Sequence, residues 1–146
     1  MARILVVDDD ALVGKAIRTM LEALGHTVIV ADGGHSALPA LEMFAFDMVM
    51  IDIIMPGMNG LDVIKAVREN APDAAIVAMS GYAFQGGSSD RDYLQLAKTF
   101  GATHCMRKPF RPKDLVEAIE VCIGLPDVGL GKPSADGKKR DRALGA

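Results

Sequence analysis

The chain has 146 residues, about the size of one domain, so we expect one hydrophobic core and one active centre. Half of the residues are apolar and only 5% are aromatic, which indicates a globular protein with an aliphatic core and excludes a disordered chain. The net charge is −3, and the acidic excess lies in residues 1–124, which argues against nucleic acid as the main partner.

Cysteine content and hydropathy indicate the compartment. Cys105 and Cys122 lack the spacing of metal ligands and are too few for a disulfide scaffold, so we expect a reduced, cytoplasmic protein. The apolar run at residues 4–7 is too short for a signal peptide. No later run avoids charged residues for the roughly 20 positions that a membrane helix needs, so no membrane partner is expected.

In chain order, five short apolar runs predict β-strands. They lie at residues 4–7, 28–31, 48–51 and 75–79, with a weaker one at 104–106. Apolar residues at consecutive positions are typical of strands whose two faces are both covered, as in a parallel sheet.

Segments with helical spacing alternate with these runs. Their apolar stripes consist of Val13, Ile17, Met20, Leu21 and Leu24; of Ala37, Leu38, Leu41 and Phe44; of Leu61, Ile64 and Val67; and of Leu115, Ile119 and Cys122. Gly25 and Pro72 stand where the first and third helices should stop. The alternation predicts an α/β fold, a five-stranded parallel sheet with helices on both faces.

Ligands of such sheets bind beyond the carboxyl ends of the strands. The residues at those ends are Asp8, Asp9 and Asp10 after the first strand, Asp52 after the third, Ser80 after the fourth and Lys108 after the fifth. Beyond residue 124 the composition shifts to Gly, Pro, Lys and Asp without periodicity. We therefore expect one domain at residues 1–124 and a flexible basic C-terminal tail at 125–146.

The acidic residues at these ends predict a Mg²⁺ site. Carboxylates that converge at one edge repel one another unless a cation compensates them, and Mg²⁺ prefers oxygen ligands. Asp8, Asp9 and Asp52 suit Mg²⁺ better than Zn²⁺, which would favour His or Cys. The alternative is that adjacent aspartates merely cap the first helix, where Asp10 stands at a good N-cap position.

Ser80 and Lys108 add the groups that a phosphorylated carboxylate needs. A lysine and a divalent cation offset charge on the phosphoryl oxygens, and a hydroxyl donates a hydrogen bond to them. Asp52 would be the nucleophile that forms an aspartyl phosphate. Alternatively, Ser80 is a turn residue and Lys108 a solvated loop lysine.

Four segments carry a shared signature: ILVVDDD at residues 4–10, MIDIIMPGMNG at 50–60, AMSG at 78–81 and RKPF at 107–110. In order and spacing they resemble the receiver domain of bacterial response regulators. The resemblance covers residues 2–124 and implies the flavodoxin-like receiver fold with strand order 2-1-3-4-5.

The resemblance also implies roles for single residues. Asp52 would accept phosphate from a histidine kinase or a histidine phosphotransfer protein, Ser80 would be the switch hydroxyl and Lys108 the phosphate-sensing cation. Mg²⁺ would be held by Asp9, Asp52 and the Ile54 carbonyl, with Asp8 acting through water. The bond before Pro109 would be cis.

Departures from the family pattern concern switching and phosphate lifetime. Cys105 stands where receivers usually carry an aromatic residue. Tyr82 or Tyr93 is a candidate replacement, or a surface tyrosine with no switching role. Ile54 and Tyr82 border the expected path of attacking water. Residues 81–90 form a longer loop than usual, either a lid or docking loop or a plain surface insertion.

Together these features predict a single-domain response regulator that signals through contacts with a downstream protein, without direct DNA binding and without enzymatic turnover of a substrate. Two other functions stay open. One is a haloacid-dehalogenase-like phosphohydrolase, because Asp8 and Asp10 mimic its opening motif. The other is a receiver-like interaction module that is not phosphorylated.

Overall fold

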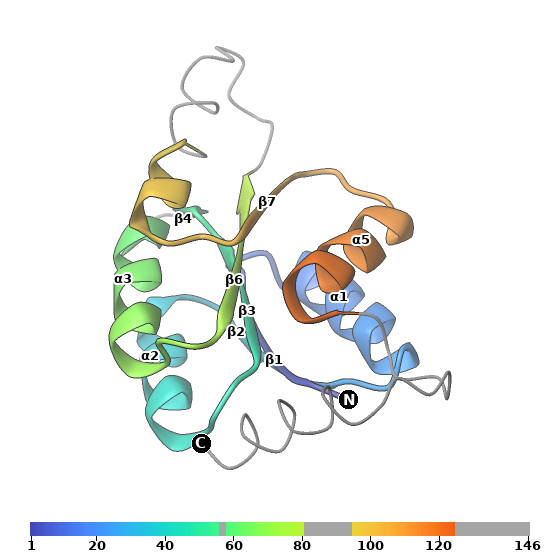
Figure 1. The fold of residues 1–146 in the computed structure, drawn as a ribbon, viewed down its shortest axis with the longest axis horizontal. Helices are drawn as coiled ribbons and strands as arrows, with labels where there is room; N and C mark the ends of the chain where they lie inside the picture. Colours follow the sequence, from blue (N-terminus) through green and yellow to red (C-terminus); the bar gives the residue numbers. More distant parts are fainter. Residues whose placement is uncertain (56–57, 81–94, 125–146) are drawn as a thin grey trace.

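The computed structural model describes residues 1–55, 58–80 and 95–124. Its centre is a parallel sheet of five strands in the order β2-β1-β3-β6-β7 (Figure 1). The strands are β1 Arg3–Val7, β2 Thr27–Ala31, β3 Met48–Asp52, β6 Ala75–Ser80 and β7 His104–Arg107. Each is one residue longer than its predicted run, and the predicted order 2-1-3-4-5 is confirmed when these five strands are counted along the chain.

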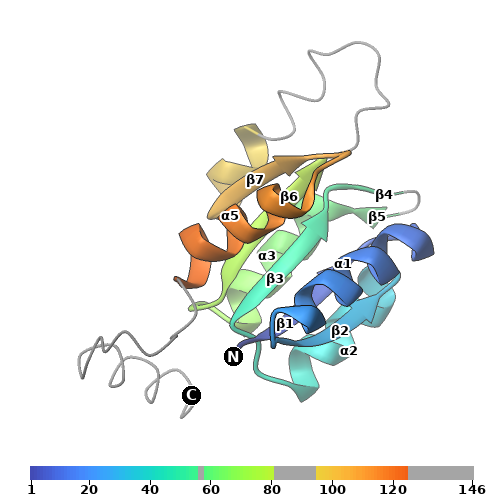
Figure 2. The same cartoon turned by 90° about the vertical axis from the view of Figure 1, so that its right-hand side faces the viewer.

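Helices cover both faces of the sheet. They are α1 Ala11–Ala23, α2 Gly34–Met43, α3 Gly60–Asn70 and α5 Pro112–Ile123. Residues 95–100 are helical as well. Figures 1 and 2 show α1 and α5 on one face, and α2, α3 and the segment at 95–100 on the other.

The core has two layers because strand residues point alternately to the two faces. On β1, Leu5 and Val7 belong to the cluster beneath α2 and α3, whereas Ile4 and Val6 belong to the cluster beneath α1 and α5. All four are fully buried. Burial on both faces is the physical reason why the strands are continuous apolar runs in the sequence.

Two helices end before the last residue of their predicted stripe. Leu24 and Phe44 are the C-caps of α1 and α2 and are exposed. Gly25 follows Leu24 with a φ of 95°, a conformation that glycine adopts without strain, and this turns the chain away from the helix axis. The apolar side chains at both positions therefore lie outside the core.

One local structure has no counterpart in the prediction. Strands β4 Ile54–Met55 and β5 Met58–Asn59 form a two-stranded antiparallel sheet directly after β3. Strands of two residues are too short to show any periodicity in a sequence. In the part of the chain that the structure describes, no helix is long and apolar enough to cross a membrane. The tail at 125–146 lies outside the described residues.

Candidate functional site

The site lies where four strands end at the carboxyl edge of the sheet. Asp8 follows β1, Asp52 ends β3, Ser80 ends β6 and Lys108 follows β7. Since these strands are parallel and β1, β3, β6 and β7 are successive neighbours in the sheet, their carboxyl ends meet at one edge. The fold thus brings together residues that are up to 100 positions apart in the chain.

Lys108 joins two of the carboxylates directly. Its Nζ lies 2.6 Å from Asp8 Oδ2 and 3.1 Å from Asp52 Oδ2. The exposed fractions of the three side chains are 17% for Lys108, 0% for Asp8 and 7% for Asp52, so the contacts are shielded from water. The alternative interpretation of Lys108, a solvated loop lysine, is therefore wrong.

The other oxygen of each carboxylate is held by the backbone. Asp8 Oδ1 accepts a hydrogen bond from the N–H of Asp10 at 2.9 Å, and Asp52 Oδ1 accepts one from the N–H of Ile54 at 3.1 Å. Each buried carboxylate is thereby fixed at both oxygens, one by backbone and one by Lys108. Such contacts orient a charged group before any ligand arrives.

Asp10 has the capping role that sequence considerations had raised. Its carboxylate accepts hydrogen bonds from the N–H groups of Leu12 at 3.0 Å and Val13 at 3.4 Å, and so begins α1. The adjacent aspartates thus have separate roles. Asp10 caps α1, whereas Asp8 and Asp9 belong to the carboxylate site.

Burial and charge pairing together set the electrostatics of the pair formed by Asp52 and Lys108. Burial raises the pKa of the Asp52 carboxyl above its ordinary value, against the opposing effects of the Ile54 N–H and of Lys108. For Lys108, burial lowers the pKa, but the contacts with Asp8 and Asp52 outweigh this and raise it above the ordinary value. Lys108 is therefore a fixed positive charge at neutral pH.

The carboxylates fit a divalent metal ion. Carboxylate oxygens of Asp8, Asp9 and Asp52 all lie within 4.8 Å of one another, and Asp9 is exposed where Asp8 and Asp52 are buried. Among the described residues this cluster contains carboxylates alone, the ligand type that Mg²⁺ prefers and Zn²⁺ does not. One lysine cannot balance three carboxylates, so a divalent cation suits the charge of the cluster as well.

Gly60 fixes the loop that follows Asp52, a role that sequence considerations missed. A Cβ at Gly60 would lie 2.3 Å from Ile53 Cα and 2.6 Å from the Asp52 carbonyl oxygen. The Gly60 N–H also donates to the Ile53 carbonyl at 3.2 Å, and the Ile53 N–H donates to Met79 at 2.9 Å. A glycine at the start of a predicted helix, just after the acidic strand end, was the available signal.

The remaining predicted site residues lie at or near the same edge. Ser80 is fully buried, and its carbonyl accepts the N–H of Lys108 at 2.8 Å. The Lys108–Pro109 peptide bond is cis. Ile54 is half-buried in β4, and where its carbonyl lies relative to a bound metal stays a prediction.

Of the proposed switch features, the structure describes Cys105. Cys105 on β7 is half-buried, packs on the cluster beneath α2 and α3, and has a pKa raised by burial. Tyr82, Tyr93 and the loop at 81–90 lie outside the described residues. Cys105 therefore places a small side chain where the family pattern has an aromatic ring.

Comparison with known proteins identifies the family. A family model described as the response regulator receiver domain matches residues 4–120. The chain belongs to this family. Receiver domains are parts of two-component systems, in which they pair with histidine kinases, and phosphorylation and Mg²⁺ binding are general properties of the family.

The receiver resembles parts of longer curated proteins. The DNA-binding response regulator MtrA of Mycobacterium tuberculosis is 34% identical over 117 residues, which are 80% of this chain and 48% of MtrA. The transcriptional regulatory protein CpxR of Escherichia coli is 33% identical over 123 residues, 84% of this chain and 50% of CpxR. The chain thus spans about half the length of these relatives.

Solved receiver structures match over most of their own length. A receiver domain protein from Clostridium thermocellum has a TM-score of 0.74 at 30% identity and covers 84% of this chain and 94% of its own. The chemotaxis protein CheY4 of Vibrio cholerae has a TM-score of 0.73 at 28% identity, with 84% and 99% covered. Both support the receiver fold described above.

Proposed function

We propose that this receiver is a phosphoacceptor and that Asp52 is the residue phosphorylated. An Asp52 carboxylate oxygen attacks the phosphorus of a phosphohistidine, the P–O bond forms, the P–N bond breaks, and the imidazole of the donor leaves with the electron pair. The observation that carries the proposal is the set of distances that places Lys108 3.1 Å from Asp52 and 2.6 Å from Asp8, beside the exposed carboxylate of Asp9.

The neighbours of Asp52 have separate tasks in this proposal. Lys108, already charged and oriented, lies where it can offset charge on the transferred group, and the Ser80 hydroxyl would donate a hydrogen bond to a phosphoryl oxygen. Asp8, Asp9 and Asp52 would hold Mg²⁺, with the Ile54 carbonyl as a further ligand. Bound there, the ion would neutralise negative charge on the phosphoryl oxygens.

A groove beside the site suits a phosphodonor protein. A cavity of about 400 Å³ lies between α1 and the loop after β7, and its lining consists of Val13, Ala16, Ile17, Met20, Lys108, Pro109 and Phe110. It is apolar apart from Lys108, so it would accept apolar side chains of a partner while that partner's phosphohistidine reached Asp52. We therefore propose a histidine kinase or a histidine phosphotransfer protein as the donor.

The output proposed is contact with a downstream protein, by a receiver that neither binds DNA nor turns over a substrate. The acidic charge of residues 1–124 supports the absence of DNA contacts. No disulfide joins Cys105 and Cys122, which is consistent with action in the cytoplasm. Lack of turnover on p-nitrophenyl phosphate would separate this proposal from a phosphohydrolase.

The test is phosphorylation by acetyl phosphate with Mg²⁺, followed by intact mass spectrometry. The wild type should gain one phosphoryl group, and Asp52→Asn should gain none because an amide cannot form an acyl phosphate. Asp73→Asn, a change of an exposed aspartate, is the matched control and should label like the wild type. Labelling of Asp52→Asn at the wild-type rate would refute the assignment, and a wild type that never labels would favour the unphosphorylated interaction module.

A further inference from the structure

Helix α3 begins in direct contact with the backbone of the proposed phosphoacceptor. Gly60, its first residue, packs so closely that a Cβ there would lie 2.6 Å from the Asp52 carbonyl oxygen and 2.3 Å from Ile53 Cα. The Gly60 N–H also donates to the Ile53 carbonyl. A displacement of the Asp52–Ile53 peptide would therefore meet the start of α3 with no flexible side chain between them to absorb it.

The second half of α3 is hydrogen-bonded to the turn that follows the helical segment at 95–100. Arg68 Nη2 donates to the Gly101 carbonyl at 2.6 Å, and Arg68 Nη1 donates to the Ala74 carbonyl at 2.7 Å. Gly101 approaches so closely that a Cβ there would lie 2.8 Å from Arg68 Nε. The guanidinium thus links three pieces of chain, namely α3, the residues before β6 and the turn after the segment at 95–100.

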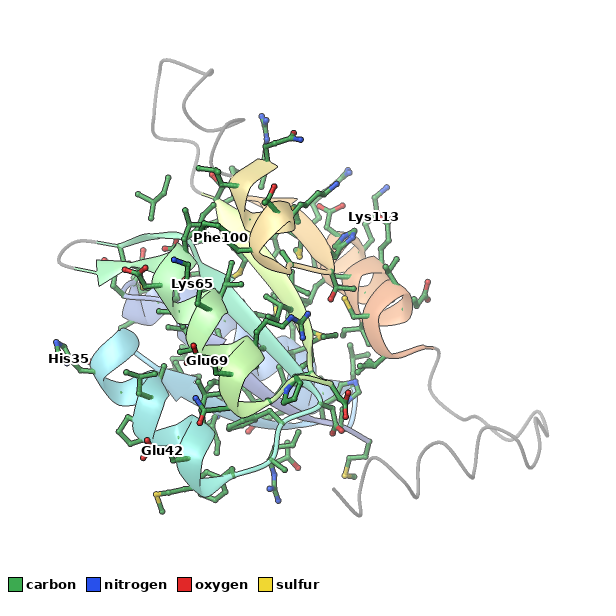
Figure 3. The ribbon with its side chains drawn as sticks, turned by 60° about the vertical axis from the view of Figure 1, so that its left-hand side comes forward. His35, Glu42, Lys65, Glu69, Phe100 and Lys113 are labelled. Carbon is green, nitrogen blue, oxygen red and sulfur yellow. The ribbon has the colours of Figure 1, made fainter. Side chains whose placement is uncertain are left out.

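A second contact lies one helical turn earlier. Lys65 Nζ lies 4.8 Å from the ring centroid of Phe100, in the geometry of a cation–π interaction, and Figure 3 shows these two side chains beside each other. Ala97 is fully buried in the cluster that also contains Ile64 and Val67 of α3. Charged and apolar contacts therefore hold the same pair of elements together.

We propose that α3 is the connection through which the state of Asp52 reaches residues 97–103. A regular helix shifts as a unit, so its start, seated on the Asp52 loop, and its second half, fastened to Gly101 and Phe100, move together. Arg68 and Lys65 are positioning residues in this proposal. The inference rests on the proposed function, because it takes Asp52 as the group whose state changes.

The affected segment has an exposed side through which a partner would sense the change. Lys98 of this segment is exposed, and Leu96, directly before the segment, is 42% exposed. The Ala102 N–H donates to Ala97 and the Thr103 N–H donates to Ile76, so amide signals of these residues report directly on the turn that Arg68 holds.

The test records amide chemical shifts of the full chain with Mg²⁺, before and after addition of beryllofluoride, an analogue of the acyl phosphate. In the wild type, the amides of Ile54, Gly101 and Thr103 should all shift. In Arg68→Gln, the shift at Ile54 should persist, whereas those at Gly101 and Thr103 should fall by roughly half or more, since such linking contacts modulate coupling without touching the ligand. Lys65→Gln, an exposed change, should give a smaller reduction.

Arg18→Gln is the matched control, because Arg18 is an exposed arginine that pairs with Glu22 on α1, at 3.0 Å. It should leave all the shifts as in the wild type. Shifts at Gly101 and Thr103 that are equal in Arg68→Gln and wild type would overturn the inference, and so would a wild type in which Ile54 responds but Gly101 does not. The comparison of Ile54 with Gly101 in the wild type needs no variant. If even Ile54 fails to respond, the proposed function itself is wrong.

Discussion

Lys108 places one positive charge against two buried carboxylates, and this contact sets the electrostatics of the site. Residue type and strand-end position sufficed to select Asp8, Asp9, Asp52, Ser80 and Lys108 from the sequence, because parallel strands must end at one edge. The direct pairing of Lys108 with both Asp8 and Asp52 was not predictable, since it depends on side-chain conformations that no pattern encodes.

Lys108→Ala should bind Mg²⁺ more tightly than the wild type while it accepts phosphate more poorly. A unit charge about 4 Å away is worth about 4 kcal/mol at an effective dielectric constant of about 20, and relaxation reduces this, so we expect roughly a tenfold gain in affinity, about 1.4 kcal/mol. Calorimetric titration with Mg²⁺ measures it. Lys15→Ala, an exposed change on α1, is the control; unchanged or weaker Mg²⁺ binding by Lys108→Ala would contradict the site described here.

His26 is expected to make the stability of the fold sensitive to pH. Its Nδ1 accepts the N–H of Ala2 at 3.1 Å, which requires that nitrogen to be unprotonated, and burial lowers its pKa below 6.5. The folded chain then binds fewer protons than the unfolded chain. The stabilising contribution is therefore fully present above pH 6.5 and is lost as the pH falls through the lowered pKa of the folded state.

Urea unfolding at several pH values between about 7.5 and 5 checks this prediction. His26→Gln should show a flatter loss of unfolding free energy on acidification than the wild type, whereas His35→Gln, at an exposed position of α2, should follow the wild type (Figure 3). The prediction fails if the His26→Gln and wild-type profiles are parallel.

At the scale of elements, the five strands were predictable because burial on both faces requires continuous apolar runs. Such runs can be recognised in the sequence alone. The stripes of α1 and α2 extended one residue too far, at Leu24 and Phe44, since an exposed apolar residue after a helix looks the same in sequence as one within it. The β4–β5 pair was missed because two-residue strands carry no period.

The contact of α3 with the loop after Asp52 predicts a large cost for Gly60→Ala. The added methyl group would meet backbone atoms, which cannot rotate away, so we expect about 3 kcal/mol of lost unfolding free energy, the upper end for overpacking. Gly33→Ala is the matched control, because nothing lies within 4 Å of its Cβ position, and it should cost less than about 1 kcal/mol. Equal losses of unfolding free energy in the two variants, measured by urea unfolding, would show that the close contact of Gly60 with the backbone after β3 does not affect stability.

At the scale of the whole molecule, the acidic charge of residues 1–124 is expected to prevent binding of duplex DNA. Basic residues gather instead in residues 125–146, where a net charge of +2 supports only weak contacts. Fluorescence anisotropy with a labelled duplex should show no binding tighter than about 10⁻⁴ M at physiological salt, which is the weak end of non-specific affinity. Tight, sequence-selective binding would contradict the prediction, and the chain would then resemble its DNA-binding relative MtrA in output as well as in sequence.

Chemical trapping of the phosphorylated residue tests the central claim most directly. After reaction with a phosphohistidine donor and Mg²⁺, borohydride reduction converts an aspartyl phosphate to homoserine, and peptide mass spectrometry locates it. We predict homoserine at position 52, with Asp8, Asp9 and Asp10 unchanged. Homoserine at any of those three positions, or at none while phosphate transfer is complete, would contradict the assignment of Asp52 as the phosphoacceptor.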